Sequence, residues 1–83
     1  MPLFLIERKF AEQLELSHDD VEHIEDVNKQ MDIQWLFSFL TADKRKTYCL
    51  YQASNGDLIR DAARRLNIPA DEIVEVDKIT PPS

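Results

Sequence analysis

The segment from Ile33 to Leu40 constrains the fold most strongly, because it is apolar or aromatic at nearly every position. Side chains alternate between the two faces of a β-strand, so Trp35, Phe37 and Phe39 are expected on one face and Leu36 on the other. Both faces of this strand are therefore apolar. A sheet that contains it needs cover on both sides.

β-branched, aromatic and other apolar residues predict four strands. These cover Leu3–Ile6, Ile33–Leu40, Thr47–Tyr51 and Glu72–Ile79. The charged segment 42–46 joins the second and third strands as a hairpin turn. Turn length sets the pairing of a hairpin, and a slip of one residue moves every side chain to the opposite face. The sequence therefore leaves open which tyrosine of the third strand, Tyr48 or Tyr51, faces which side.

Of the possible hairpin registers we favour a five-residue turn, with Thr41 opposite Thr47. This register places Phe37 near Tyr51 and Phe39 near Cys49.

Two helices are predicted from capping signals and apolar periodicity. Ser17 is a good N-cap, and Asp20 three residues later completes a capping box. Apolar residues then recur at spacings of three and four from Val21 to Met31. The second helix begins at the Ser54–Asp57 cap and ends at Asn67, a residue suited to a left-handed C-terminal cap.

The order strand, helix, strand, strand, helix, strand over residues 1–79 predicts one α+β domain of the ferredoxin-like βαββαβ type. It has a four-stranded antiparallel sheet, and right-handed crossovers place both helices on one face. Residues 80–83 are expected to form a flexible C-terminal tail. A chain of 83 residues leaves no room for a second domain.

The predicted sheet has one face that no helix covers, and that face is apolar. Such a patch on a soluble protein marks an interface or a ligand cavity. We expect a homodimer whose sheets face each other, with a partly enclosed pocket between or beneath them; loops or the tail could instead cover the face. The residues expected at the pocket or dimer face are Trp35, Phe37, Phe39, Tyr51, Cys49 and Glu7, with Arg8 as the alternative to Glu7 for the polar group.

The net charge and the lack of a targeting signal reduce the classes of partner that we expect. The net charge of −6 repels a phosphate backbone, and the third strand lacks the glycine and basic residue of RNA-recognition modules, so nucleic acid is not expected. The apolar run Leu3–Ile6 is too short for a signal-peptide core or a membrane span. With a lone cysteine that cannot form an internal disulfide, this predicts a cytoplasmic protein with no membrane partner.

The only histidines, His18 and His23, lie among acids on the first predicted helix. Five positions turn a helix by about 500°, so the two rings point about 140° apart and cannot chelate one ion together. Asp19 with His23, or His18 with Glu22, could each supply two metal ligands at i and i+4. Solvated helix residues with no ligand are the simpler interpretation.

Short segments spread over nearly the whole chain resemble a family of small bacterial proteins of unknown function, of which one member type is described as nickel-binding. These are Phe4–Arg8, Ile33–Trp35, Tyr48–Ala53, Ile59–Arg60, Arg64–Arg65 and Pro69–Asp71. The resemblance implies a ferredoxin-like fold, a dimer and nickel as a cofactor. This chain departs from the family pattern at three positions. Ala62 stands where many members have histidine, Asn67 replaces a glycine, and Phe37 replaces a common carboxylate.

No catalytic motif is present, and three functions remain open. The first is a dimeric binding protein for a metal ion or a small apolar ligand at or near the open sheet face. The second is a cofactor-independent enzyme like the dimeric ferredoxin-like barrels, which predicts a cavity with a perturbed ionisable group. The third is a pure protein-interaction module.

Overall fold

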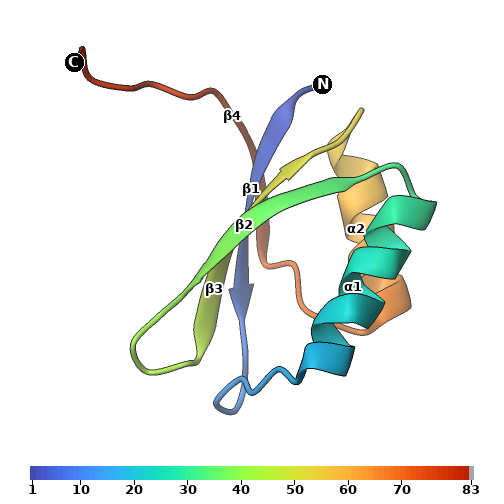
Figure 1. Ribbon diagram of the computed structural model, residues 1–83. Coiled ribbons are helices and arrows are strands. Elements are labelled where there is room, and N and C mark those ends of the chain that lie inside the picture. The colour runs from blue at the N-terminus through green and yellow to red at the C-terminus, as the bar shows by residue number, and fades with distance from the viewer. Residues whose placement is uncertain (83) are drawn as a thin grey trace.

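The computed structural model describes residues 1–82 and confirms the predicted order of elements (Figure 1). The elements are β1 (Leu3–Lys9), α1 (His18–Gln30), β2 (Gln34–Leu40), β3 (Lys46–Gln52), α2 (Gly56–Leu66) and β4 (Glu72–Val76). The strands form one antiparallel sheet in the order β2-β3-β1-β4. This is the ferredoxin-like βαββαβ fold.

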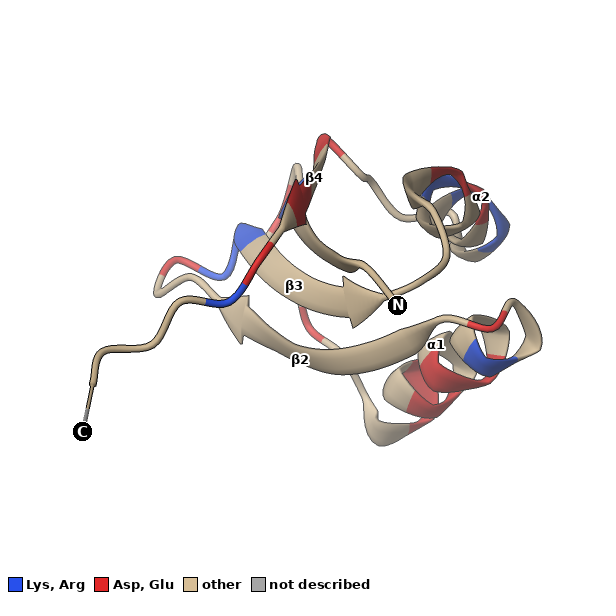
Figure 2. Ribbon diagram, turned by 90° about the horizontal axis from the view of Figure 1, so that it is seen from above, with Lys and Arg blue, Asp and Glu red and all other residues tan. Residues whose placement is uncertain are grey.

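Both helices lie on the same side of the sheet, and the opposite side carries no helix (Figures 1 and 2). The core fills the space between the layers. On β1 it takes Phe4 and Ile6, which alternate with the outward-facing Leu3 and Leu5 as the period of a strand requires. The helices contribute four buried apolar residues, namely Val27, Ile59, Ala62 and Ala63. Neither helix in the described chain is long and apolar enough to cross a membrane.

The predicted caps are present at both helices. The Asp20 backbone N–H donates to Ser17 Oγ and the Ser17 N–H to Asp20 Oδ2, each at 3.1 Å, which completes the capping box of α1. Asn55 caps the start of α2 by accepting from the Leu58 N–H at 3.1 Å. Asn67 ends α2 in the left-handed region, at φ 56°.

Two strands differ in length from the prediction. β1 continues to Lys9 because β3 is long enough to pair with it, with Arg8 opposite Thr47 and Lys9 opposite Lys46. β4 ends at Val76 rather than Ile79. Val76 pairs with Leu3, the first residue of β1, so the chain beyond Val76 has no partner strand. Residues 77–82 extend away from the sheet (Figure 1), and Ser83, the end of the predicted tail, lies outside the described residues.

The expected alternation along β2 is wrong at one point, because a β-bulge lies between Trp35 and Phe37. Trp35 pairs with Tyr51 and Phe37 with Leu50, so Leu36 is an extra residue on β2. The extra residue reverses the faces that follow it. Trp35 therefore turns toward the helices, whereas Phe37 turns to the open face.

The predicted hairpin register is also wrong. Phe37 lies opposite Leu50 rather than Tyr51, and Phe39 lies opposite Tyr48 rather than Cys49. Tyr51 and Cys49 are buried on the helix side, so Tyr48 is the tyrosine of the open face. The turn is the physical reason, because Leu40 rather than Thr41 lies opposite Thr47, so each pair between the turn and the bulge is displaced by one residue.

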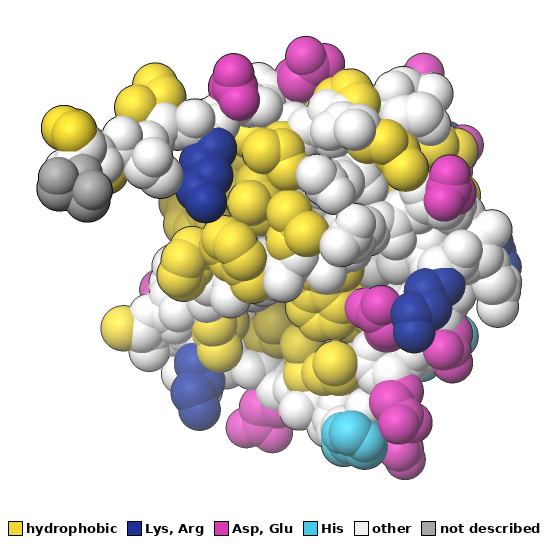
Figure 3. All heavy atoms as spheres, turned by 45° about the horizontal axis from the view of Figure 1, so that its top comes forward, with side chains coloured by type: hydrophobic (Ala, Val, Ile, Leu, Met, Phe, Trp, Pro, Cys, Tyr) yellow, Lys and Arg dark blue, Asp and Glu magenta, His cyan; other side chains and the backbone are white. Residues whose placement is uncertain are grey.

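The open face is apolar, and no segment of residues 1–82 covers it. Phe37 is 50% and Phe39 64% exposed, with Val74 at 46% at the far edge of the sheet. Leu5 and Leu50, which pair with each other across β1 and β3, lie between them. Hydrophobic side chains gather in a continuous area beside the point where the C-terminal segment leaves the body (Figure 3). The C-terminal segment runs away from the body and leaves these side chains exposed.

Asn67 offers a test of the cap that ends α2. Its positive φ is costly for residues other than Gly and Asn. We expect Asn67→Ala to lower the free energy of unfolding by about 1 kcal/mol, whereas Asn67→Gly should leave it unchanged or raise it slightly. Urea unfolding followed by circular dichroism measures both, and equal stability of the two variants would contradict the role of the left-handed cap.

Candidate functional site

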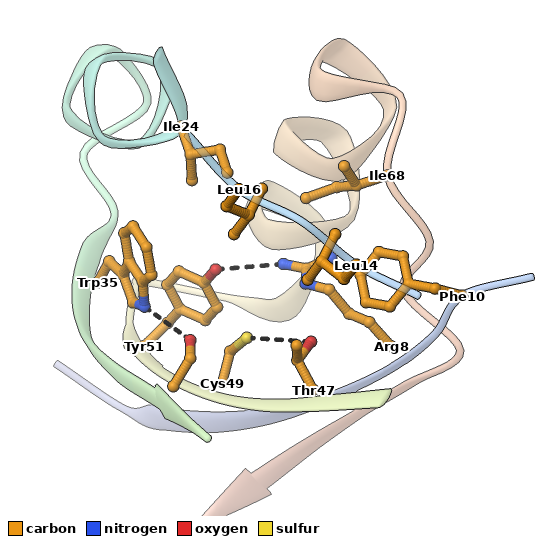
Figure 4. Close-up of a pocket in the computed structure, with 11 residues that line it drawn as sticks. Arg8, Phe10, Leu14, Leu16, Ile24, Trp35, Thr47, Cys49, Tyr51 and Ile68 are labelled. Atoms are coloured by element: carbon orange, nitrogen blue, oxygen red, sulfur yellow. Dashed lines mark hydrogen bonds between the residues drawn. The ribbon is translucent and has the colours of Figure 1, made fainter. Parts of the chain in front are cut away.

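A small cavity lies between the helix side of the sheet and the segment that joins β1 to α1 (Figure 4). Its volume is about 70 Å³, several times the roughly 10–15 Å³ that one water molecule requires. The sheet forms its floor and the two helices and the joining segment form its roof. The lining residues are Arg8, Phe10, Leu14, Leu16, Ile24, Trp35, Ser38, Thr47, Cys49, Tyr51 and Ile68.

The roof is held in place by the hairpin turn between β2 and β3. The Phe10 N–H donates to the Arg45 carbonyl at 2.8 Å, and the Leu14 N–H donates to the Lys44 carbonyl at 2.6 Å. These two bonds tie the segment 10–17 across the end of the sheet. Leu14 and Leu16 are thereby placed over the cavity as apolar cover (Figure 4).

Trp35 and Tyr51 form the aromatic part of the floor. Their rings stack with centroids 6.5 Å apart, and the Trp35 indole N–H donates to Ser38 Oγ at 2.9 Å. Both contacts exist because the bulge at Leu36 turns Trp35 to the helix side. The indole is thus fixed by a stack and a hydrogen bond rather than by packing alone.

Arg8 is the charged group of the cavity. It shares the inward face of β1 with Phe4 and Ile6, and it is only 4% exposed. Its guanidinium donates to the Pro69 carbonyl at 2.6 Å and to the Tyr51 hydroxyl at 3.3 Å, with the guanidinium carbon 5.8 Å from the centre of the Tyr51 ring. Within residues 1–82 it forms no ion pair with a carboxylate.

Tyr51 is the one ionisable group of the cavity whose titration is clearly perturbed. Burial raises the pKa of its phenol above the ordinary 10.0, and the nearby Arg8 charge opposes this only in part. The phenol therefore keeps its proton across the physiological range. Since its oxygen accepts the bond from Arg8, its own hydrogen is available as a donor.

Cys49 packs in the floor as a small buried group. Its thiol lies 3.6 Å from Thr47 Oγ1, as expected for a weak S–H donor. The cavity contains no histidine, aspartate or glutamate. The thiol consequently has no base beside it to activate it as a nucleophile.

The structure divides the six residues predicted for the pocket or dimer face between the two sides of the sheet. Trp35, Cys49 and Tyr51 line the cavity on the helix side. Phe37 and Phe39 lie on the open face. Glu7 is also on the open side, where its carboxylate lies 3.6 Å from Lys9 Nζ, so Arg8 and not Glu7 supplies the polar group of the cavity.

The metal candidates lie elsewhere, on the exposed face of α1. His18 Nε2 lies 3.2 Å from Glu22 Oε1, which is one of the two predicted i and i+4 pairs. Asp19 and His23 are exposed on the same helix. No cluster of three or more His, Cys, Asp or Glu residues in the described part of the chain is arranged to hold a metal ion. One chain alone therefore does not supply a closed metal site.

The comparisons with known proteins identify the family. The family model described as nickel responsive protein SCO4226-like matches residues 4–76. The chain belongs to this family. The resemblance seen in the sequence is thus confirmed.

One solved structure supports the fold. The crystal structure of SCO4226 from Streptomyces coelicolor A3(2) is 16% identical to this chain, with a TM-score of 0.72, and the match covers 94% of this chain and 99% of that one. At this identity the likeness shows a shared ferredoxin-like fold. No curated protein matches the chain significantly.

The sequence did not predict the residues that cover the cavity. Phe10, Leu14 and Leu16 lie in a segment without regular secondary structure, where no periodicity marks a buried face. Arg8 left a usable signal, because it follows Phe4 and Ile6 at the same alternate spacing. That spacing indicates an inward-facing charge.

The perturbed phenol predicts a difference in stability at alkaline pH. Tyr51 has a higher pKa in the folded than in the unfolded chain, so its contribution is complete below the ordinary value of 10.0 and is lost as pH rises through the folded pKa. We expect Tyr51→Phe to cost about 1 kcal/mol at pH 7 through the lost hydrogen bond. The gap between variant and native protein should narrow above pH 10.

Thermal or urea unfolding of both proteins between pH 7 and pH 11 measures this gap. Tyr48→Phe, on the opposite side of the sheet, is the matched control. A Tyr51→Phe deficit that stays constant over the whole range would contradict the assignment.

Proposed function

We propose that this member of the SCO4226-like family is a homodimeric binding protein that holds a small ligand in the cavity between the sheet and the helices. The cavity carries the proposal. It joins fixed aromatic groups, apolar cover and a convergent pair of hydrogen-bond donors, Arg8 and Tyr51, which is the composition typical of a small-molecule site.

Binding suits the cavity better than catalysis. A raised pKa makes the Tyr51 phenol a weaker acid, and no side chain among the lining residues can act as a general base near neutral pH. The enzyme alternative predicted a cavity with a perturbed ionisable group, and Tyr51 is such a group. Its environment favours the protonated donor form, which orients a ligand but does not transfer a proton.

The dimer is proposed from the open face of the sheet. Phe37, Phe39 and Val74 are about half exposed or more, and they flank Leu5 and Leu50 in one area that crosses all four strands. An apolar area of this kind on one chain is stabilised by covering it. A second copy offers the same face, and antiparallel sheets commonly pack face to face. The ligand cavity lies on the other side of the sheet and stays available in such a dimer.

Phe39→Glu tests the dimer, because Phe39 is the most exposed ring of the open face. A carboxylate at that position would be buried beside its copy or beside apolar groups, and either arrangement opposes association. We expect light scattering to give twice the 9.7 kDa chain mass for the native protein and the single-chain mass for the variant. Ile79→Glu, at a residue 94% exposed beyond β4, is the control and should stay dimeric. A native protein of single-chain mass at micromolar concentration would contradict the dimer.

Nickel is proposed as a second ligand, from the family description together with the helix pair. His18 and Glu22 are the only predicted metal ligands that the structure brings together, and imidazole suits Ni²⁺. Two ligands do not complete a site, so the remaining donors must come from outside one chain. A second dimer would supply them, because the proposed dimer packs through the open face and leaves α1 on the side of the sheet away from the partner.

Calorimetry of the tag-free protein with nickel chloride tests this second ligand. We expect saturable heat for the native protein, loss of that heat in His18→Ala and its retention in His23→Ala. The His23→Ala variant removes the histidine that has no acidic partner within contact distance. Absence of heat for the native protein would contradict nickel binding.

A further inference from the structure

We infer that the cavity takes a small carboxylate with a short apolar body, its carboxylate accepting hydrogen bonds from Arg8 and Tyr51. The inference rests on the proposed function, since it names the chemical class of the ligand for that same cavity. It stands on the charge of Arg8, the phenol hydrogen of Tyr51, which the bond from Arg8 does not use, and the nature of the remaining walls.

The buried charge of Arg8 favours an anionic ligand. A guanidinium is always protonated and carries five N–H donors, and it is costly to bury unless a negative group accompanies it. Arg8 is 4% exposed, yet its partners are two neutral oxygens, the Pro69 carbonyl and the Tyr51 hydroxyl. Among residues 1–82 no carboxylate pairs with it, and none lines the cavity. An anion in the cavity would offset the buried charge.

The direction of the hydrogen bond between Arg8 and Tyr51 also favours a carboxylate. Arg8 donates and the phenol oxygen accepts at 3.3 Å, so the phenol hydrogen points elsewhere. Both side chains line the cavity, and their polar ends lie together (Figure 4). Two donors of this kind match the two oxygens of one carboxylate.

The remaining wall of the cavity is mainly apolar. It therefore suits a ligand whose charged group is small. Apolar and aromatic residues surround the Arg8 and Tyr51 pair, with Trp35 and Ile24 on one side and Phe10 and Ile68 on the other (Figure 4). A phosphate brings a second charge and a third oxygen, for which the cavity has no further cation. A carboxylate brings one charge and leaves its hydrocarbon part to the apolar wall.

The space beyond the charged end also suits an apolar tail. The cavity shares Leu14, Leu16, Ser38 and Thr47 with a shallower hollow of about 430 Å³ at the end of the β2–β3 hairpin. That hollow is lined in part by Leu40. A short chain attached to the carboxylate therefore has an apolar path out of the cavity.

Titration of the native dimer with hexanoate, followed by the fluorescence of Trp35, tests the inference. Trp35 is the single tryptophan of the chain and lies in the cavity wall, so its emission reports on ligand in the cavity. Hexanamide, a neutral molecule of the same shape, is the matched probe. We expect hexanoate to bind at least about 10-fold more tightly than hexanamide, the range of a charged hydrogen bond.

Three variants test which side chains cause the preference for hexanoate over hexanamide. Arg8→Met should remove the preference for hexanoate over hexanamide, and Tyr51→Phe should reduce it several-fold. Arg60→Met, which removes an exposed arginine of α2 away from the cavity, should leave the preference unchanged. Should Arg8→Met fail to fold, Tyr51→Phe and the two probes still decide the matter.

Two outcomes would overturn the inference, and they separate it from the proposed function. Equal affinity for the two probes would show a small-molecule site without preference for an anion, leaving the proposed binding function in place. No saturable change with either probe would overturn the carboxylate ligand and count against the cavity as a ligand site. A preference that persists equally in Arg8→Met and Tyr51→Phe would place the anion elsewhere and overturn the inference as well.

Discussion

The extra residue at Leu36 determines how both sides of the sheet are used. A β-bulge breaks the alternation of side chains, so Trp35 and Phe37, two positions apart, lie on opposite faces. Trp35 can then stack on Tyr51 and wall the cavity, while Phe37 and Phe39 remain on the open face. Without the bulge all three aromatic rings would share one face. The cavity would lose its indole and the open face would gain it.

The distribution of residues between the two faces of the sheet also separates the two proposed roles of the molecule. The helix side encloses a small cavity whose only charge is Arg8, and the opposite side is a broad apolar surface suited to a second chain. A ligand and a partner therefore need not compete for the same residues. Acidic residues recur along α1 (Figure 2). This helix, where His18 lies beside Glu22, is a third region, and it is the one for which nickel binding is proposed.

Arg8 shows what a buried charge requires in a domain this small. Its bonds to the Pro69 carbonyl and to Tyr51 fix the guanidinium near the end of α2 and satisfy part of its donors, but they add no negative charge. The carbonyl of a residue just past a helix C-terminus carries only a partial charge. The unbalanced charge of Arg8 is the reason for proposing that the cavity prefers an anion to a neutral apolar molecule of the same size.

The sequence alone is sufficient to predict the order of elements, the ferredoxin-like fold and the caps. Ser17 with Asp20 and Asn67 act through neighbours only a few residues away, and the strand and helix periods are local as well. It also determined that the sheet has apolar residues on both faces, since the composition of Ile33–Leu40 requires this in any register.

Which of these residues share a face depends on how the strands pair in the folded chain. The bulge depends on how β2 pairs with β3, and the end of β4 depends on where β1 begins, so neither can be read from one strand alone. The cavity likewise requires the segment 10–17 to cross the hairpin turn and bond to Lys44 and Arg45. These pairings join residues from 13 positions apart, as for Phe37 with Leu50, to 73 positions apart, as for Leu3 with Val76, and local propensity carries no information about them.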